Sequence, residues 1–350
     1  MLEEKLKSLA LKEGAIRAGI ARREAFAEAP PSADMTYVQP WVQSVVSFAL
    51  PLGTEWIRDY FAKVTRMEIK KVLYHSYHKI YQIGAVLEDH LKKAGYRAYN
   101  IVPNGQYRPD HTFSKTVPDP DLKPPLSLRY MAVGAGVGEF GWSGNVMVPG
   151  AWSNVYLGAV ITDAPLSSDA LLNEKLCDRC RACVRVCPMG FMDMKEKVSV
   201  KIAGREHIYN KKRGDYRCFI CCAGYTGISK EGTWSSWSTG RKVLPEDDSL
   251  LLGFYVRLRS DPANAMATKN TTSGTRGVLA RTLEDANPTC ANCGTVCSGP
   301  RDHRLALMEL LFSSGSVEKD ARGREIVIKA KKCKGIRGSE DSRVRDAIRL

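Results

Sequence analysis

The sequence predicts an α+β protein of the α/β type, with a sheet-bearing first part and a cysteine-bearing second part. Helical and strand-like segments alternate up to about residue 170. Of the eleven cysteines, all but Cys333 fall between residues 177 and 297. With 44% hydrophobic and 26% charged residues, the composition is that of a globular protein. We therefore expect domains at 1–170 and 171–313, followed by a basic tail at 314–350.

The first part begins with a predicted amphipathic helix at 1–14, where leucines recur among Glu and Lys at helical spacing. Residues 44–52 form an apolar run of strand length that ends at proline and glycine, which predicts a buried strand. Residues 56–94 repeat apolar side chains at three and four positions, which predicts one or two long helices. Two further strands and two irregular segments complete this part: 96–102, the proline-rich 103–125, the glycine-rich 134–144 and 155–161.

Charge and apolar patterning bear on partners and location. The net charge of +14 favours a polyanionic partner such as nucleic acid or a phosphate-bearing cofactor. No apolar run approaches the roughly 20 residues of a membrane helix, and Arg22-Arg23 lacks the apolar region that follows in an export signal. We therefore expect a cytoplasmic protein that does not span a membrane. Thiols stay reduced there, so the cysteines indicate metal or redox chemistry rather than disulfides.

Four cysteines carry the strongest motif, Cys177-x2-Cys180-x2-Cys183-x3-Cys187-Pro188. In bacterial ferredoxins this spacing binds 4Fe-4S clusters: three thiolates hold one cluster, and the fourth, before proline, turns toward a second. A zinc site would normally use two CxxC pairs and needs neither the third cysteine nor the Cys-Pro pair. The spacing therefore favours iron–sulfur clusters over zinc.

A second set of cysteines, Cys290-x2-Cys293-x3-Cys297, has three members. Two 4Fe-4S clusters need eight thiolates. In a two-cluster fold, Cys297 completes the first cluster. Cys187, Cys290 and Cys293 then belong to the second cluster and need one more ligand.

The eighth ligand is sought between the two sets, where three cysteines lie close together. Cys218, Cys221 and Cys222 all stand in this interval. We favour Cys218, with Cys222 as the runner-up, and leave the choice among the three open. The spare cysteines are expected to be ordinary thiols, and Cys333 in the lysine-rich tail a bystander.

Five stretches of the chain, taken in order, resemble the epoxyqueuosine reductases and, more distantly, the reductive dehalogenases. The resemblance implies a nitroreductase-like, cobalamin-binding domain fused to a ferredoxin-like module with two 4Fe-4S clusters. In that family the clusters deliver single electrons to a base-off cobalamin. The matching stretches are residues 131–145 (MAVGAGVGEFGWSGN), the apolar 155–161 with Asp163-Ala-Pro-Leu166, the CxxCxxCxxxCP motif, Arg217-Cys218 and the later CxxCxxxC set.

The resemblance also implies cofactor-binding residues in the glycine-rich stretch. A Gly-Trp-Thr-Gly segment of the family lies against the corrin, and Gly-Trp-Ser-Gly-Asn takes its place here. Glycines let the backbone approach a large flat ring, and a tight turn that needs glycine is the alternative explanation. The candidates are Gly138, Gly141, Trp142, Ser143, Gly144 and Asn145.

The proton donor departs from the family pattern. Epoxyqueuosine reductases carry an aspartate shortly before a stretch that resembles residues 124–129, and the aligned position here is Leu122. Asp121 lies one residue away and is one catalytic candidate. Tyr130 with Arg129 is the other, because it resembles the tyrosine donor and basic neighbour of the dehalogenases. A buried acid would need a raised pKa to stay protonated at neutral pH.

Together these features predict a cytoplasmic iron–sulfur oxidoreductase that passes electrons to a corrinoid for a reductive deoxygenation or elimination. We expect a low-potential electron donor of the ferredoxin or flavodoxin type, with modified tRNA as the first substrate class and a small electrophile as the second. The alternative is an electron-transfer protein without a substrate of its own.

The insertion 234–241 has three open explanations: substrate stacking, cluster shielding or local packing.

Overall fold

A computed structural model describes residues 1–103, 107–108, 123–261, 283 and 288–329. The expected mixture of helices and strands is confirmed. The first part contains α1 (Leu2–Lys12), β1 (Arg17–Arg22), β2 (Ser44–Pro51), α2 (Ile57–Phe61), α3 (Met67–Lys93), β3 (Ala98–Asn100), α5 (Leu128–Gly134), β4 (Glu139–Phe140), β5 (Val146–Met147) and β6 (Val155–Thr162). The second part contains α6 (Ala182–Arg185), β7 (Met192–Ile202), β8 (Arg205–Lys212), α7 (Tyr216–Cys222), α8 (Leu251–Ser260), α10 (Asn292–Thr295), α11 (Arg301–Ser313), β9 (Ser316–Lys319) and β10 (Glu325–Ile328).

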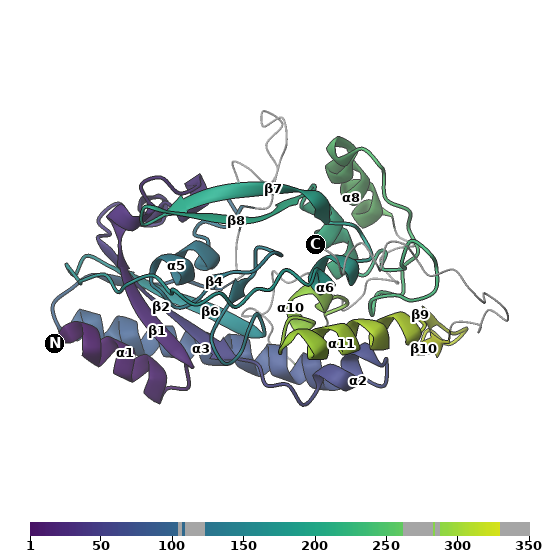
Figure 1. Cartoon of the computed structure of the whole chain (residues 1–350), viewed down its shortest axis with the longest axis horizontal. Helices are drawn as coiled ribbons and strands as arrows, with labels where there is room; N and C mark the ends of the chain where they lie inside the picture. The colour runs from purple at the N-terminus through teal and green to yellow at the C-terminus, as the bar shows by residue number, and fades with distance from the viewer. Residues whose placement is uncertain (104–106, 109–122, 262–282, 284–287, 330–350) are drawn as a thin grey trace.

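The first part is built on a four-stranded sheet in the order β1-β2-β6-β3, with every neighbouring pair antiparallel. Alternate residues of a strand point to opposite faces. Val46 and Phe48 of β2 pack with α1 and α3 on one face, whereas Val45 and Ala49 pack with α5 on the other. Figure 1 shows α1 and α3 along one side of this sheet. An antiparallel sheet covered in this way belongs to the α+β class.

Most predicted elements of the first part are confirmed, but β1 was not predicted. Its sequence, RAGIAR, begins and ends with arginine and has no long apolar run. Gly19 lets this strand lie close to the backbone of Ala135, because a Cβ at Gly19 would be 2.0 Å from the Ala135 carbonyl oxygen. The loop after α5 therefore packs directly on the strand backbone, which a side chain would prevent.

The hairpin of β7 and β8 links the two parts of the chain. It belongs to the second part by sequence, but Val200, Ile202 and Tyr209 lie in the same hydrophobic core as α5. Figure 1 shows the hairpin reaching across to the sheet-bearing part. The expected boundary near residue 170 therefore separates sequence segments but not hydrophobic cores.

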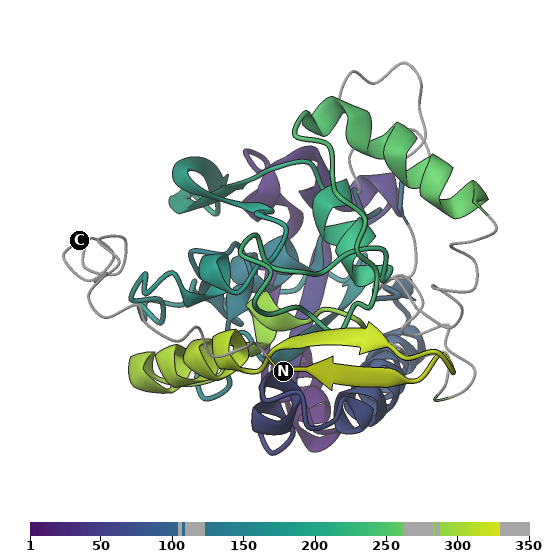
Figure 2. The same cartoon turned by 90° about the vertical axis from the view of Figure 1, so that its right-hand side faces the viewer.

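The C-terminal segment differs from the expected basic tail at 314–350. Strands β9 and β10 pair as an antiparallel hairpin, and Val317 is fully buried in the core around the cysteines. Figure 2 shows this hairpin beside α11. The basic segment from 330 onward, with Cys333, lies outside the described residues. In the part of the chain that the structure describes, no helix has both the length and the apolar character of a membrane span.

Candidate iron–sulfur and cofactor site

Four cysteines from two distant stretches form the first thiol group. Cys177, Cys180 and Cys183 come from the turn that leads through α6, and Cys297 follows α10. Burial raises the pKa of the Cys183 thiol, and the negative charge of Cys297 raises it further. The charges of Cys177 and Cys180 likewise raise the pKa of the Cys183 thiol and that of the Cys297 thiol. These mutual effects indicate that the four thiols lie close to one another; that they hold one cluster stays a prediction.

Donor groups surround this first thiol group. The backbone N–H of Trp142 donates to Cys177 Sγ at 3.2 Å, and Arg304 Nη1 donates to Cys180 Sγ at 3.7 Å. Arg304 also pairs with Asp178 at 2.8 Å, so its charge is partly neutralised by a carboxylate. Hydrogen bonds to ligating sulfurs help set the reduction potential of an iron–sulfur cluster. This environment suits sulfurs that bind a redox-active cluster.

Cys187, Cys218, Cys290 and Cys293 form the second thiol group. Burial raises the pKa of Cys187 to about 11, and the charges of Cys290 and Cys218 add to this effect. Burial also raises the pKa of Cys293 to about 12, with Cys218 and Cys187 as its nearest charged neighbours. Cys218 thus faces the other thiols of this group from its position on α7.

The other two cysteines of α7 are less well placed for the second group. Cys222 Sγ lies 3.8 Å from Cys218 Sγ and donates to the Cys290 carbonyl at 3.6 Å. Cys221 is buried, and its Sγ lies 3.7 Å from Ser236 Oγ and next to the Cys290 thiol. The geometry therefore favours Cys218 as the fourth member and leaves Cys222 as the alternative.

The donor set of the two groups fits 4Fe-4S chemistry. Each group offers four cysteine sulfurs, the usual ligand set of such a cluster. Arg179 and Arg181 adopt left-handed backbone conformations, with φ of 56° and 61°, which bend the chain between the first three cysteines. Among the described residues, no three His, Cys, Asp or Glu side chains are placed to hold a single metal ion. Because burial opposes ionisation of the thiols, cluster loading and thiol deprotonation would occur together.

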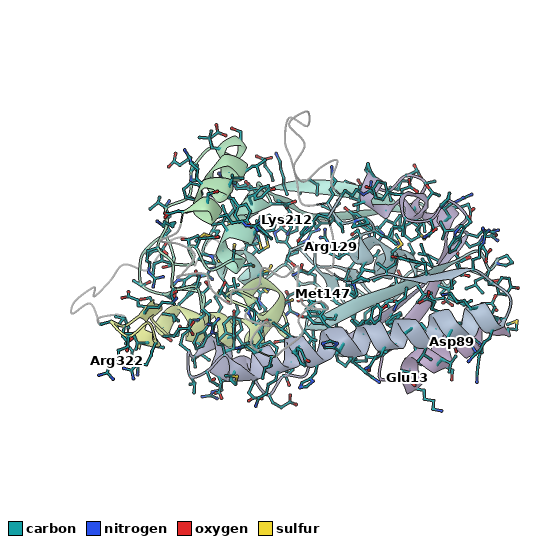
Figure 3. All side chains as sticks on the ribbon, turned by 180° about the vertical axis from the view of Figure 1, so that it is seen from behind. Glu13, Asp89, Arg129, Met147, Lys212 and Arg322 are labelled. Carbon is teal, nitrogen blue, oxygen red and sulfur yellow. The ribbon has the colours of Figure 1, made fainter. Side chains whose placement is uncertain are left out.

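One buried lysine, Lys63, and one partly buried lysine, Lys212, accompany the thiols. Lys212, at the end of β8, lies near Cys183 of the first group and Cys293 of the second, and it donates to the carbonyl of Ser143. Lys63, just after α2, lies near Cys290. Burial lowers the pKa of Lys63 to about 7, while the charge of Cys290 acts in the opposite direction. Figure 3 shows Lys212 in the interior, in the same region as Arg129 and Met147.

A partly open cavity of about 340 Å³ lies between the sheet-bearing part and the second thiol group. Its walls are mainly apolar, its rim is polar, and Cys293 belongs to its lining. The side-chain oxygen of Asn154 is buried there without a hydrogen-bond partner among the described residues. The cavity lining includes Tyr77 of α3, Val155 and Tyr156 of β6, and the polar residues Arg129, Asn145, Ser153 and Asn154.

Among the predicted cofactor-binding residues, Asn145 lines this cavity and the others do not. A Cβ on Gly138 would lie 2.4 Å from the Met147 carbonyl oxygen, and one on Gly141 would lie 2.8 Å from Met147 Sδ. Gly144 has a positive φ of 72°. The space at Gly138 and Gly141 is therefore taken by the chain itself, which agrees with the tight-turn explanation. Trp142 and Ser143 are buried outside this cavity.

The three predicted catalytic residues are placed differently from one another. Arg129 lines the cavity and donates to the Gly144 carbonyl at 2.7 Å. Tyr130 does not line it: its hydroxyl lies 3.1 Å from the hydroxyl of Tyr209 in the core of the sheet-bearing part. Asp121 lies outside the described residues. The described geometry thus supports Arg129 and gives Tyr130 a packing role.

Tyrosines that were not predicted stand at the same cavity. Tyr77 and Tyr156 stack with ring centroids 4.2 Å apart, and both line the wall. Burial raises the pKa of Tyr156 well above its ordinary value. Tyr107 does not line this cavity; burial raises its pKa too, with further increases from the charges of Cys222 and Cys218. Tyr77 was missed because its position in α3 fits the apolar face of a helix.

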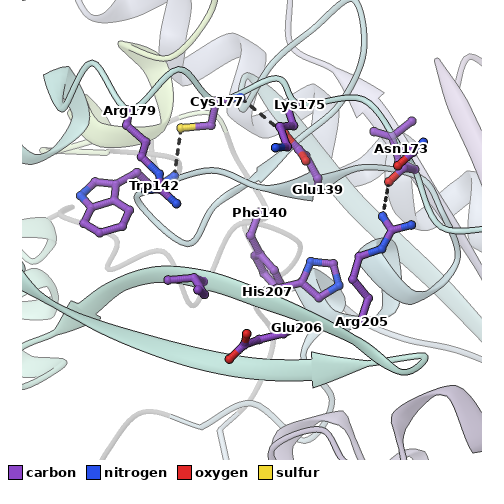
Figure 4. Close-up of a pocket in the computed structure, with 12 residues that line it drawn as sticks. Glu139, Phe140, Trp142, Asn173, Lys175, Cys177, Arg179, Arg205, Glu206 and His207 are labelled. Atoms are coloured by element: carbon purple, nitrogen blue, oxygen red, sulfur yellow. Dashed lines mark hydrogen bonds between the residues drawn. The ribbon is translucent and has the colours of Figure 1, made fainter. Parts of the chain in front are cut away.

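A second cavity, of about 550 Å³, lies beside Cys177 of the first thiol group (Figure 4). Aromatic rings of Phe140, Trp142 and His207 contribute to its walls. The indole N–H of Trp142 has no acceptor among the described residues. Its charged lining consists of the cations Lys175, Arg179 and Arg205 and the carboxylates Glu139 and Glu206.

The two carboxylates of this second cavity are already engaged. Glu139 accepts a hydrogen bond from the Cys177 backbone N–H at 3.4 Å, and Glu206 accepts one from Ser199 at 2.6 Å. Arg179 extends over the Trp142 ring, 5.3 Å from its centroid. With three cations and two carboxylates, the lining has one more positive than negative charge, close to the first thiol group.

The insertion 234–241 packs against the second thiol group and α11. Trp234 stacks on Phe312 with ring centroids 5.2 Å apart. The Trp237 indole N–H donates to the Tyr60 carbonyl at 3.0 Å, and both rings lie in the core around the cysteines. Both tryptophans are buried. Of the three explanations left open, local packing accounts for Trp234, and the Trp237 backbone N–H donates to the carbonyl of Thr289, the residue before Cys290, at 2.8 Å.

Comparisons with known proteins agree with the motif of the first four cysteines. A family model described as a 4Fe-4S binding domain matches residues 170–193. An epoxyqueuosine reductase of Atelocyanobacterium thalassa (isolate ALOHA) is 27% identical over 180 residues, which cover 50% of this chain and 51% of that protein. One from Listeria monocytogenes is 31% identical over 111 residues, which cover 28% and 29%. The matches thus span about half of the first relative and less of the second.

Solved structures give more distant likenesses. The reductive dehalogenase structure described as suggesting a mechanism for B12-dependent dehalogenation has a TM-score of 0.46 at 17% identity, covering 79% of this chain and 37% of that one. An epoxyqueuosine reductase with an epoxyqueuosine-modified tRNA stem loop has a TM-score of 0.39 at 15% identity, covering 89% and 81%. The resemblance predicted from the motifs is confirmed in sequence: this chain contains a 4Fe-4S binding domain and is similar, over part of its length, to epoxyqueuosine reductases.

Proposed function

We propose that this chain is a cytoplasmic iron–sulfur oxidoreductase that carries two 4Fe-4S clusters and transfers electrons one at a time. The observation that carries the proposal is the position of the two thiol groups between two cavities. Cys177 of the first group lines the larger cavity, and Cys293 of the second group lines the smaller one. Lys212 lies near thiols of both groups, so the groups are neighbours. Electrons would enter beside Cys177 and leave beside Cys293.

The acceptor that best suits the smaller cavity is the corrinoid implied by the resemblance. A corrin ring is apolar on its faces and carries amide side chains at its edge. Asn154, with its unpartnered oxygen, together with Arg129 and Asn145, would hold such an edge. At about 340 Å³ the cavity is at the lower end of ligand pockets, so it would enclose an edge rather than the whole ring. A bound corrinoid supplies a strongly reducing, nucleophilic cobalt centre.

The chain's own residues have two tasks at this cavity. The apolar wall excludes water from the acceptor, which strengthens the electrostatic effect of Arg129. The hydroxyls of Tyr77 and Tyr156 hold protons that a reductive cleavage consumes, and the raised pKa of Tyr156 keeps its proton in place at neutral pH. Modified tRNA is the first substrate class, because of the sequence relatives and the net charge of +14, and a small electrophile is the second.

A specific observation favours the alternative, an electron-transfer protein without a substrate of its own. Of the six predicted cofactor-binding residues, Asn145 lines the smaller cavity and the others lie elsewhere. An electron carrier would keep both clusters and need no corrin cradle. The two functions differ in whether a corrinoid binds, so binding is measured first.

Anaerobic reconstitution of the full chain should yield about eight iron atoms per chain, four for each cluster. Added cobalamin should bind and change its visible spectrum, and the loaded protein should convert epoxyqueuosine in tRNA. Eight irons without corrinoid binding would contradict the reductase and support the electron carrier. About four irons would contradict the two-cluster proposal itself.

The electron donor, of the ferredoxin or flavodoxin type, is proposed to dock over the larger cavity. Excess positive charge beside Cys177 attracts a negatively charged partner and orients it for transfer. Lys175→Glu should therefore raise the KM for the donor several-fold at low salt, with kcat unchanged and the difference shrinking at high salt. Lys5→Glu on α1 makes the same charge change at an exposed position and serves as the control. Equal effects of the two variants would mean that net charge, and not this cavity, guides the donor.

A further inference from the structure

Lys63 is buried in an unusual environment. The residue is 4% exposed, and its ammonium nitrogen has no hydrogen-bond partner among the described residues. It lies 5.6 Å from the centroid of the Trp237 ring and 5.7 Å from that of Tyr60. Its backbone has φ of 59°, the left-handed region that favours glycine. A buried charge without a partner and a strained backbone at one residue both act against folding.

The charge that faces Lys63 belongs to the second thiol group. Its ammonium lowers the pKa of the Cys290 thiol, after the larger effect of the hydrogen bond from Cys221. Tyr60, three residues earlier, holds the same loop: its hydroxyl accepts from the Ala291 N–H at 2.9 Å and lies 2.9 Å from Asn292 Oδ1. Segment 60–63 is thus fixed against the stretch that begins at Cys290.

Two nearby cations, Arg304 and Arg66, differ from Lys63 in having acidic partners, whereas Lys212 donates to the Ser143 carbonyl. Arg304 at the first thiol group pairs with Asp178 at 2.8 Å. Arg66, 5.9 Å from the same Trp237 ring, pairs with Glu325. For Lys63 the described residues provide no carboxylate, and the thiol whose pKa its charge lowers is Cys290 of the second group.

We propose that Lys63 is the counter-charge of the second cluster and makes that cluster easier to reduce than the first. The inference rests on the two-cluster proposal above. One electron from the low-potential donor adds one negative charge at the second thiol group. A buried ammonium stabilises that extra charge strongly, because the surrounding medium is less polarisable than water. Lys63 therefore draws electrons from the first group toward the smaller cavity.

The test compares Lys63→Met with Arg66→Met in the full, anaerobically reconstituted chain. Redox titration followed by electron paramagnetic resonance measures the two clusters separately. Lys63→Met should shift the reduction equilibrium of the second cluster toward the oxidised form by about tenfold, which is about 59 mV for one electron. The first cluster should be unaffected. Arg66→Met, which removes a paired cation beside the same ring, should leave both potentials unchanged.

A second variant and a stability measurement guard against misfolding. Lys63→Arg keeps the charge and should keep the potential close to that of the unmodified chain. Cluster-free Lys63→Met should melt at a higher temperature, since an unpaired buried charge is removed. Two results would overturn the role of Lys63. One is unchanged potentials in Lys63→Met with both clusters present, and the other is an equal shift of the second cluster's potential in Lys63→Met and Lys63→Arg. A single cluster in the unmodified chain would instead overturn the two-cluster proposal.

Discussion

Cys218→Ser is expected to remove the second cluster and to lower the iron content from about eight to about four atoms per chain. Cys218 is the cysteine of α7 whose charge acts on both Cys187 and Cys293. A serine hydroxyl is a much poorer ligand for iron–sulfur clusters than a thiolate. Iron and sulfide analysis, with electron paramagnetic resonance of the reduced protein, measures the loss. Electron transfer to any acceptor at the smaller cavity should then stop.

Cys222→Ser is the matched control, because Cys222 lies one helical turn from Cys218 and its sulfur is only 3.8 Å away. Its iron content should stay at about eight atoms per chain. The opposite pattern, with iron lost in Cys222→Ser and kept in Cys218→Ser, would assign the eighth ligand to Cys222. Retention of iron in both variants would leave Cys221 as the ligand and contradict the geometry described above.

Val155→Trp is expected to weaken corrinoid binding at least tenfold while both clusters remain. Val155 lies at the start of β6 and is half-buried in the wall of the smaller cavity. An indole there would occupy much of the roughly 340 Å³ that the edge of the ring needs. Titration of the cluster-loaded protein with cobalamin, followed by visible spectroscopy, gives the dissociation constant. Iron analysis on the same sample shows whether the clusters are intact.

Val256→Trp on α8 is the control for this substitution, because Val256 is exposed and lies outside the cavity. It should bind cobalamin as the unmodified chain does. Normal binding by Val155→Trp would show that the corrinoid is held elsewhere on the chain. Absence of binding in the unmodified chain would make both variants uninformative about the cavity and favour the electron-carrier alternative.

The cysteine grouping could be predicted from sequence because ligand spacing is a local property. The CxxCxxC turn brings Cys177, Cys180 and Cys183 together within one loop, and the ferredoxin pattern then assigns Cys297 to them. The sequence could not decide which cysteine of α7 is the eighth cluster ligand, since Cys218 and Cys222 stand on the same face of the helix one turn apart. Three-dimensional packing against Cys187 and Cys293 was needed to separate them.

The buried strands β2 and β6 could be predicted from the sequence because both are long apolar runs. Strands β7 and β8 could not, because the apolar alternation of β7 is confined to Val198, Val200 and Ile202, and most of the residues before them are exposed. Lys63 escaped prediction for a related reason. A lysine is normally a surface residue, and neither its burial nor its backbone conformation is visible in the sequence.

The glycine-rich stretch shows a further limit of sequence reasoning. A glycine that admits a cofactor and a glycine that admits the chain itself look the same in one sequence. At Gly138 and Gly141 the nearest atoms belong to Met147, so the close packing of the chain itself explains why glycine stands at these two positions. Asn145 reaches the smaller cavity because it lies just beyond the turn.

The hairpin of β7 and β8 has a consequence for how the protein is made. A chain leaves the ribosome from its N-terminus, so residues 1–170 emerge first. Their core stays incomplete until Val200, Ile202 and Tyr209 have followed. By then the first four cysteines, which precede the hairpin, are already outside the ribosome. The first four cysteines therefore emerge before the core of the sheet-bearing part can close.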